Sequence, residues 1–332
     1  MEQATPILDV RNVSKAFVRK AGVIDKALSF AGLGAQDEIA IAVDGASFQA
    51  GRGEVIGIVG ESGCGKSTLG RAIAGVLPPT SGQILYEQED VYADCDAKKR
   101  LGIQLIFQDP FASLNPRLNI GSIIGEAARY HKLLPDSDHE DYVDRLMQQV
   151  GLNASYKARY PHQFSGGQRQ RIGIARALAV KPKVLVCDEA VSALDVSIQA
   201  QILNLFLELQ ETLGLTYVFI SHDLGVVHHV SDRLLVMYLG RVVESGIASD
   251  ILADPSHPYT RALLEDLPRL GQRKRSFHPI KGEIPSPLAP PTGCHFHPRC
   301  PHAMAVCKKE APPLREVAPK RYVACHLDEG VS

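Results

Sequence analysis

The sequence lacks three features, and each absence excludes a class of protein. No apolar run approaches the roughly 20 residues needed to cross a bilayer. The 36 basic and 37 acidic residues give a formal charge of −1, without the broad basic surface that non-specific nucleic-acid binding requires. The N-terminus has no basic segment followed by a long apolar core, which argues against a secretory signal. We therefore expect a soluble cytosolic chain with no nucleic-acid partner.

The remaining composition is that of a folded protein. Hydrophobic residues make up 45% and charged residues 22% of the chain, a balance typical of globular rather than disordered proteins. A length of 332 residues predicts two domains, or one large domain with appendages. We find no internal repeat and no coiled-coil heptads. The sequence therefore predicts an ordinary compact core with additional segments.

Short apolar runs alternate with helical patterns over most of the chain. Residues 54–59, 104–107, 184–187 and 217–220 are brief apolar runs bounded by charges, glycine or proline, which is typical of buried strands in a mainly parallel sheet. Residues 196–213 place apolar side chains at helical spacing. This alternation predicts an α/β fold with a mixed, mainly parallel sheet.

Three regions interrupt the alternation. Residues 109–182 contain no obvious strand and predict an inserted helical subdomain. Residues 19–40 are weakly patterned and predict a loop. From about residue 250 proline becomes frequent, and proline continues neither a helix nor a sheet, so this part predicts an irregular C-terminal extension. We therefore predict one main domain over 1–250 and an extension over 251–332.

A glycine-rich segment directly follows the strand at 54–59 and precedes a helical pattern. It matches the phosphate-binding pattern G-x4-G-K-S/T. Its residues are Gly60, Glu61, Ser62, Gly63, Cys64, Gly65, Lys66, Ser67 and Thr68. Glycines let backbone N–H groups turn toward phosphate oxygens, and the helix N-terminus adds about half a positive charge. We expect Lys66 to reach the β- and γ-phosphates of a bound nucleotide and the Ser67 hydroxyl to ligate Mg²⁺, an arrangement that would suit many kinases or GTPases.

Two carboxylates end the apolar strand at 184–187. Asp188 is placed to hold Mg²⁺ through water, and Glu189, one residue further on, to act as a base that polarises the attacking water. Acidic residues at a strand end are common and carry little weight alone. Together with the phosphate-binding segment they predict phosphoryl transfer, which depends on positioning and charge stabilisation.

The segment Phe164 to Arg171, FSGGQRQR, resembles the signature motif of the ABC-transporter ATPases. Its phosphate-contacting residues are intact, although Phe164 stands where leucine is commonest. The signature residues are Ser165, Gly166, Gly167 and Gln168. Other elements of that family stand in their usual order, and they are Phe17, Gln108 in IFQDP, Asp195 in SALD and His222 in FISHD. The resemblance covers nearly the whole chain.

The resemblance implies a role for each of these residues. Phe17, after the first strand, would stack on adenine, and Gln108 would contribute to the Mg²⁺ site. His222 would contact the γ-phosphate and act with Lys66 and Glu189 in catalysis. The signature helix would close on ATP bound by a second chain, and Asp195 would communicate across that dimer. The implied cofactors are ATP and Mg²⁺.

Within the family the chain looks most like the ATPase subunit of oligopeptide/dipeptide importers. Three features carry this likeness: the long loop before AVDGASF, the segment SHPYTRALL, and the cysteine-rich tail. The likeness implies a peripheral protein at the cytoplasmic face of the inner membrane. Its implied partners are a second ATPase subunit, by preference a paralogue, two permease subunits, and indirectly an extracytoplasmic solute-binding protein. The sequence does not identify the solute.

Two other functions remain as alternatives. A soluble ABC-type ATPase acting on DNA or the ribosome would usually carry a coiled-coil insertion or two cassettes, and neither is present. A metal-binding or redox-sensing module with vestigial ATPase activity conflicts with the presence of every catalytic position.

The C-terminal cysteines form a set of four, and its members are Cys294, Cys300, Cys307 and Cys325. Their spacing is not the C-x2-C pair typical of structural zinc. By resemblance to a cysteine pattern in peptide importers, they would hold a four-iron four-sulfur cluster. Zinc, with ligands drawn from His295, His297, His302 or His326, and unligated thiols are the alternatives. Cys64 and Cys187 are expected to be small buried packing residues.

Overall fold

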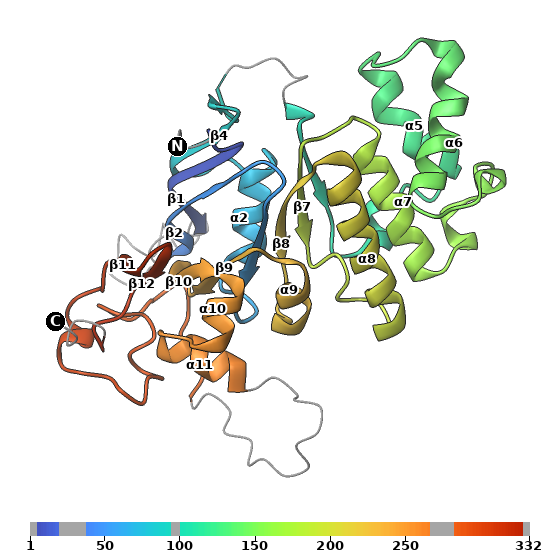
Figure 1. Cartoon of the computed structure of the whole chain (residues 1–332). Helices are drawn as coiled ribbons and strands as arrows, with labels where there is room; N and C mark the ends of the chain where they lie inside the picture. Colours follow the sequence, from blue (N-terminus) through green and yellow to red (C-terminus); the bar gives the residue numbers. More distant parts are fainter. Residues whose placement is uncertain (1–4, 20–37, 94–99, 266–281, 328–332) are drawn as a thin grey trace, which may run out of the picture.

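The computed structural model describes residues 5–19, 38–93, 100–265 and 282–327 (Figure 1). Most of the predicted loop at 19–40 lies outside these residues. Within them, the strands form two sheets, one of eight strands and one of four. Helices cover the larger sheet, so the α/β fold class predicted from the sequence is confirmed.

The eight-stranded sheet is mainly parallel. In spatial order its strands are β11 (Arg315–Ala318), β12 (Arg321–Val323), β10 (Arg241–Ile247), β9 (Arg233–Tyr238), β3 (Val55–Val59), β8 (Thr216–Ile220), β7 (Val184–Asp188) and β6 (Ile103–Ile106). From β9 to β6 all neighbours are parallel, whereas β10, β12 and β11 are added in antiparallel pairs. The sequence predicted the four strands β3, β6, β7 and β8, but not β9 or β10.

Alternate side chains of the central strands enter two different cores. On β7, Val184 and Val186 belong to one buried cluster, whereas Leu185 and Cys187 belong to the other. Side chains on a strand point alternately to its two faces, so a strand buried on both sides reads as a continuous apolar run. This is why these strands could be recognised from the sequence.

One face of the large sheet packs against helix α2 (Lys66–Ile73) and the smaller sheet. That sheet is antiparallel, with strands in the order β2 (Glu38–Ala50), β1 (Leu8–Arg19), β4 (Ser81–Tyr86) and β5 (Glu89–Asp90). Leu69, Ala72 and Ile73 of α2 are fully buried between the two sheets. The helix that follows the phosphate-binding segment is therefore held rigidly on both sides.

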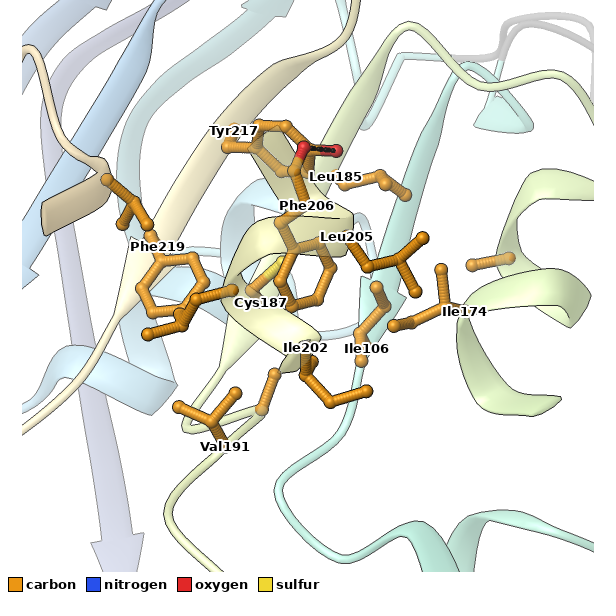
Figure 2. Close-up of a cluster of buried hydrophobic side chains, with 14 of the residues drawn as sticks. Ile106, Ile174, Leu185, Cys187, Val191, Ile202, Leu205, Phe206, Tyr217 and Phe219 are labelled. Atoms are coloured by element: carbon orange, nitrogen blue, oxygen red, sulfur yellow. Dashed lines mark hydrogen bonds between the residues drawn. The ribbon is translucent and has the colours of Figure 1, made fainter. Parts of the chain in front are cut away.

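The opposite face packs against α8 (Val196–Leu213) and α9 (Leu224–Val230). Figure 2 shows the centre of this core, where Phe206 of α8 lies against two aromatic rings of β8. Its ring centroid is 5.6 Å from that of Tyr217 and 5.8 Å from that of Phe219. The Tyr217 hydroxyl donates to the Phe206 carbonyl oxygen at 3.0 Å, so this buried phenol is satisfied.

The predicted helical insertion is present between β6 and β7. Its segments are α4 (Pro110–Ser113), α5 (Ile120–Tyr130), η1 (Asp136–Asp138), α6 (His139–Gln149), η2 (Ala154–Tyr156), η3 (Pro161–Gln163) and α7 (Gly166–Leu178). In Figure 1, α5 and α6 project beyond the β6 end of the sheet, and α7 joins them to it.

The C-terminal extension begins with α10 (Ala248–Ala253) and α11 (Pro258–Glu265), and between residues 282 and 327 its regular elements are η4 (Val306–Lys308) and the hairpin β11–β12. The sequence predicted an irregular extension and missed the hairpin, because its strands are short and only one of their residues is buried. β12 pairs with β10, so the extension continues the large sheet. The boundary predicted after residue 250 falls inside α10, and the division into two domains stays a prediction.

None of the described helices is both long and apolar enough to cross a bilayer.

Candidate functional site

The glycine-rich segment forms a loop between β3 and α2, at the carboxyl edge of the parallel strands. Two of its glycines are required by close backbone neighbours. A Cβ atom on Gly60 would lie 2.2 Å from the Met237 carbonyl oxygen, and one on Gly65 would lie 2.0 Å from the Ala42 carbonyl oxygen. Gly65 also has a φ of 106°, in the left-handed region. The loop therefore takes this path only with glycine at both positions.

Lys66 begins α2 and its side chain is buried under the loop. Its Nζ donates to the carbonyl oxygens of Gly60 at 2.7 Å and Glu61 at 2.9 Å. The ammonium group is thus held at the centre of the loop. A phosphate group entering the loop would replace these carbonyl acceptors with stronger, charged ones.

Ser67 and Asp188, both predicted near Mg²⁺, lie together. The Ser67 hydroxyl donates to Asp188 Oδ1 at 2.7 Å, and Asp188 ends β7. Burial raises the pKa of Asp188, and the nearby charge of Glu189 adds to the rise, whereas Ser67 and Arg71 oppose it. A cation here would stabilise the buried carboxylate. Mg²⁺ prefers oxygen donors, needs only one or two carboxylates and takes its remaining ligands from phosphates and water, so these residues fit it.

Glu189 lies between the two polar residues predicted to act with it. Its Oε2 accepts from Gln108 Nε2 at 2.6 Å, and its Oε1 is 3.3 Å from His222 Nδ1. Its backbone has a φ of 47°, a left-handed conformation that is uncommon outside glycine and is concentrated at functional sites. The ends of β6, β7 and β8 are adjacent at this edge, which is what brings the three residues together.

Phe17 was predicted after the first strand, but it lies within β1, opposite Ala40 of β2. Strand β1 is longer than the sequence suggested because it pairs with β2 as far as Arg19. The Phe17 ring is 45% exposed, with Lys15 Nζ 5.5 Å from its centroid. An exposed ring with one free face can stack on a nucleobase, so the predicted role stays a prediction.

The signature residues form the start of α7. The Ser165 side chain accepts from the Gln168 backbone N–H, and the Gln168 side chain accepts from the Ser165 backbone N–H at 3.0 Å, a reciprocal capping box. Ser165 and Gly166 are exposed. Helix α7 packs into the core opposite the one that buries α2, so this chain's own signature and glycine-rich loop belong to different faces of the sheet. Asp195 begins α8 and is also exposed.

The four C-terminal cysteines do not support the predicted iron–sulfur cluster. Among the described residues no group of three or more Cys, His, Asp or Glu is arranged to hold a metal ion, which weighs against zinc as well. Burial raises the pKa of Cys294 and Cys300. The Nδ1 atoms of His295 and His297 bond to backbone carbonyl oxygens.

Sequence reasoning missed two residues that contact the glycine-rich loop. Tyr259 of α11 and Arg299 of the extension both bond to Glu61. They stand about 200 residues from it in the sequence, and no local motif connects them to phosphate binding. Only the folding of the extension against the loop brings them there.

The chain is similar to known proteins over nearly its whole length. The family described as "ABC transporter" matches residues 43–192, and the one described as "Oligopeptide/dipeptide transporter, C-terminal region" matches residues 243–307. The chain is 49% identical to the oligopeptide transport ATP-binding protein AppF of Bacillus subtilis, covering 97% of both chains. It is 45% identical to the dipeptide transport ATP-binding protein DppF of Haemophilus influenzae, covering 99% of both.

Solved structures of ATP-binding cassettes share the fold. CbiO1 of Clostridium perfringens, part of the ABC transporter complex cbiONQ, superposes with a TM-score of 0.61 at 30% identity, covering 75% of this chain and 91% of that one. The dimeric post-hydrolysis state of the cassette MJ0796, bound to ADP and Pi, gives a TM-score of 0.61 at 26% identity, covering 73% and 98%. In both comparisons about a quarter of the present chain has no counterpart.

Proposed function

Because this chain belongs to the ABC transporter family, among its oligopeptide and dipeptide transport ATP-binding proteins, we propose that it hydrolyses ATP to energise the import of peptides or similar small solutes. One observation carries the catalytic part of the proposal. Glu189 lies at the end of β7 within hydrogen-bonding reach of Gln108 and close to His222, next to the Ser67–Asp188 pair. The full-length similarity to peptide transport proteins favours this function over an ATPase that acts on DNA or the ribosome.

In this proposal each side chain of the site has a separate role in phosphoryl transfer. Lys66 leaves the loop carbonyls to bind the β- and γ-phosphates, and Phe17 stacks on the adenine ring. Ser67, Asp188 and Gln108 would hold Mg²⁺, which when bound neutralises charge on the phosphate oxygens. Glu189 accepts a proton from the water that attacks the γ-phosphorus. The bond from that phosphorus to the β–γ bridging oxygen breaks, giving ADP and phosphate.

Two neighbours orient the base. Gln108 donates to one oxygen of Glu189, and the His222 ring faces the other. With both oxygens engaged, the carboxylate is aimed toward the phosphate site and not left free to rotate. His222, half exposed, is also accessible to a γ-phosphate.

We further propose that the active form is a dimer, in which the exposed signature of one chain closes on ATP held by the other. The second chain is by preference a paralogue, and two permease subunits bind the pair at the cytoplasmic face of the inner membrane. ATP contacts both chains and favours the closed state, and hydrolysis removes that contact. An extracytoplasmic solute-binding protein would deliver the solute.

Transport in a reconstituted system tests the proposal. Vesicles that contain the permease, the binding protein and the ATPase pair should take up a radiolabelled dipeptide mixture only when ATP is supplied to the cytoplasmic side. Lys66→Ala should reduce uptake to background because the phosphates lose their main cation. Glu189→Gln should do so because water loses its base. ATP-dependent uptake that survives both substitutions would contradict these roles.

A further inference from the structure

The glycine-rich loop is in contact with the C-terminal extension through one residue, Glu61. The Glu61 backbone N–H donates to the Tyr259 hydroxyl oxygen at 2.8 Å. Its carboxylate accepts two bonds from the Arg299 guanidinium, at 2.7 and 3.0 Å. Such a two-point pair between guanidinium and carboxylate is directional as well as strong. The loop is therefore held at both its backbone and its side chain by a segment outside the nucleotide-binding core.

The Tyr259 hydroxyl is fixed in space. Its ring is fully buried, with centroids 4.7 Å from Tyr238 and 5.4 Å from Phe296, which are buried as well. Phe296 and Arg299 come from the cysteine-rich segment, Tyr259 from α11 and Tyr238 from β9. Interlocked aromatic rings leave little rotational freedom. Because the Tyr259 ring is held by this cluster, its hydroxyl fixes the position of the Glu61 N–H that bonds to it.

Tyr259 and Lys66 bond to opposite ends of one peptide group. The Gly60 carbonyl oxygen accepts from Lys66 Nζ, while the N–H of the same peptide, which belongs to Glu61, donates to Tyr259. In a planar trans peptide the C=O and N–H point in opposite directions. Fixing the N–H therefore fixes the direction of the carbonyl that positions Lys66. Through this peptide the extension positions the Lys66 ammonium group in the nucleotide-free loop.

Arg299 also neutralises a charge beside the phosphate site. Glu61 follows the first glycine of the loop, and its carbonyl oxygen is 2.9 Å from Lys66 Nζ. The Arg299 side chain is 5% exposed, and its bonds to Glu61 raise its pKa, so the pair is a desolvated one. The Glu61 charge is felt inside the loop, because it adds to the rise in the pKa of Cys64 that burial causes. Unpaired, this carboxylate would repel a bound triphosphate.

We propose that Tyr259 and Arg299 are positioning residues for ATP binding, through which the C-terminal extension sets the affinity of the glycine-rich loop for nucleotide. Tyr259 orients the Gly60–Glu61 peptide, and Arg299 cancels the charge of Glu61. The proposal rests on ATP binding at this loop and not on the transported solute. Each acts through Glu61, the loop residue with which it makes its hydrogen bonds.

The charge part is tested with three variants of the full-length protein, using equilibrium dialysis of radiolabelled ATP with Mg²⁺. Arg299→Gln leaves Glu61 unpaired and should weaken ATP binding about tenfold, the effect of one partly screened charge. Glu61→Gln leaves the Arg299 cation and should tighten binding. The double variant carries neither charge and should return to within about threefold of the wild type. A purely structural pair would give no such rescue.

The orientation part is tested with Tyr259→Phe, which removes the hydroxyl and keeps the ring. ATP affinity should fall about fivefold, the effect of one hydrogen bond. Tyr217→Phe is the matched control, because this buried phenol bonds to the Phe206 carbonyl on the other face of the sheet. Arg321→Gln is the control for Arg299, since Arg321 of β12 pairs with the buried Glu244 of β10, away from the glycine-rich loop. Both controls should lower the melting temperature without changing ATP affinity.

Three results would overturn the proposal. They are equal ATP affinities for Arg299→Gln and its double variant, an affinity loss in Tyr259→Phe no larger than in Tyr217→Phe, and an equal loss in Arg321→Gln. If Arg299→Gln does not fold, the Tyr259 comparison decides alone. Failure of peptide uptake, in contrast, would leave these ATP affinities unchanged and would count only against the proposed function.

Discussion

At the scale of the residue, burial and hydrogen-bond partners decide the protonation state of a side chain. His257, fully buried before α11, illustrates this, because its Nδ1 accepts from the Tyr259 backbone N–H at 3.0 Å. The backbone N–H of His257 donates to Glu244 Oε2 at 2.9 Å. Burial lowers the pKa of His257 to about 4. The ring is therefore neutral in the folded protein and gains a proton readily only when the chain unfolds.

This shift predicts a pH dependence of stability. As pH falls below the unfolded-state pKa of about 6.5, the unfolded chain takes up a proton that the folded chain does not. The free energy of unfolding should therefore decrease between about pH 6.5 and pH 4, by about 3 kcal/mol in total from this residue. Urea denaturation from pH 7 to pH 5 measures the slope.

The control for this effect is His257→Asn, which keeps a side-chain acceptor for the Tyr259 N–H and cannot gain a proton in this range. Its stability will be lower at every pH because the smaller side chain leaves space. Its slope between pH 6.5 and pH 5 should nevertheless be flatter than that of the wild type. An unchanged slope would assign the pH dependence to other groups.

At the scale of the element, the N-termini of two helices have similar caps but different expected roles. Ser165 caps α7 and Asn119 caps α5, the Asn119 side chain accepting from the Ser122 backbone N–H at 2.8 Å. The two caps have the same local chemistry but different surroundings. Only the start of α7 is part of the signature, and Ser165 and Gly166 there are exposed.

Comparison of the two caps separates stability from function. Ser165→Ala and Asn119→Ala should each cost about 1 kcal/mol in the free energy of unfolding, because each leaves a helix N–H without its acceptor. We expect only Ser165→Ala to lower ATP turnover strongly in the assembled transporter, since the serine is expected to reach the phosphate of the partner's ATP. Equal turnover in both variants would remove Ser165 from the ATP site.

At the scale of the whole molecule, the glycine-rich loop and the signature lie apart, on different faces of the large sheet. The glycine-rich loop belongs to the face covered by α2 and the smaller sheet, and the signature belongs to the face covered by α7 and α8. One chain therefore does not close its own site. We expect the missing half to come from a second chain.

A block in hydrolysis should make this dimer visible. Glu189→Gln preserves the shape of the side chain but removes the base, so ATP stays intact and holds two chains together. Size-exclusion chromatography with ATP should show a species of twice the mass, which the wild type forms only transiently. Adding Lys66→Ala to this variant should abolish the larger species. A monomer in saturating ATP would contradict the two-chain site, unless the partner must be a paralogue, which mixing with that paralogue tests.

The sequence by itself determined the local chemistry and the secondary structure that carries it. Asp188 and Glu189 could be predicted because they stand at the end of a continuous apolar run, and such runs form strands buried on both faces. Lys66 could be predicted because it belongs to a glycine-rich pattern between another such run and a helix. The helix 196–213 was predicted at its exact bounds because its apolar positions recur at helical spacing. These patterns depend on neighbouring residues in the chain, so they can be recognised from one sequence alone.

Tertiary structure decided what depends on contacts between distant segments. The antiparallel sheet and the hairpin β11–β12 were missed because half-exposed strands carry weak patterns and are fixed by their pairing partners. The predicted cluster of cysteines rested on spacing along the chain, which does not place side chains in space. Arg299 and Glu61 are in contact although they are 238 residues apart in the sequence. Such contacts form when the extension packs against the core, so they depend on the folded structure.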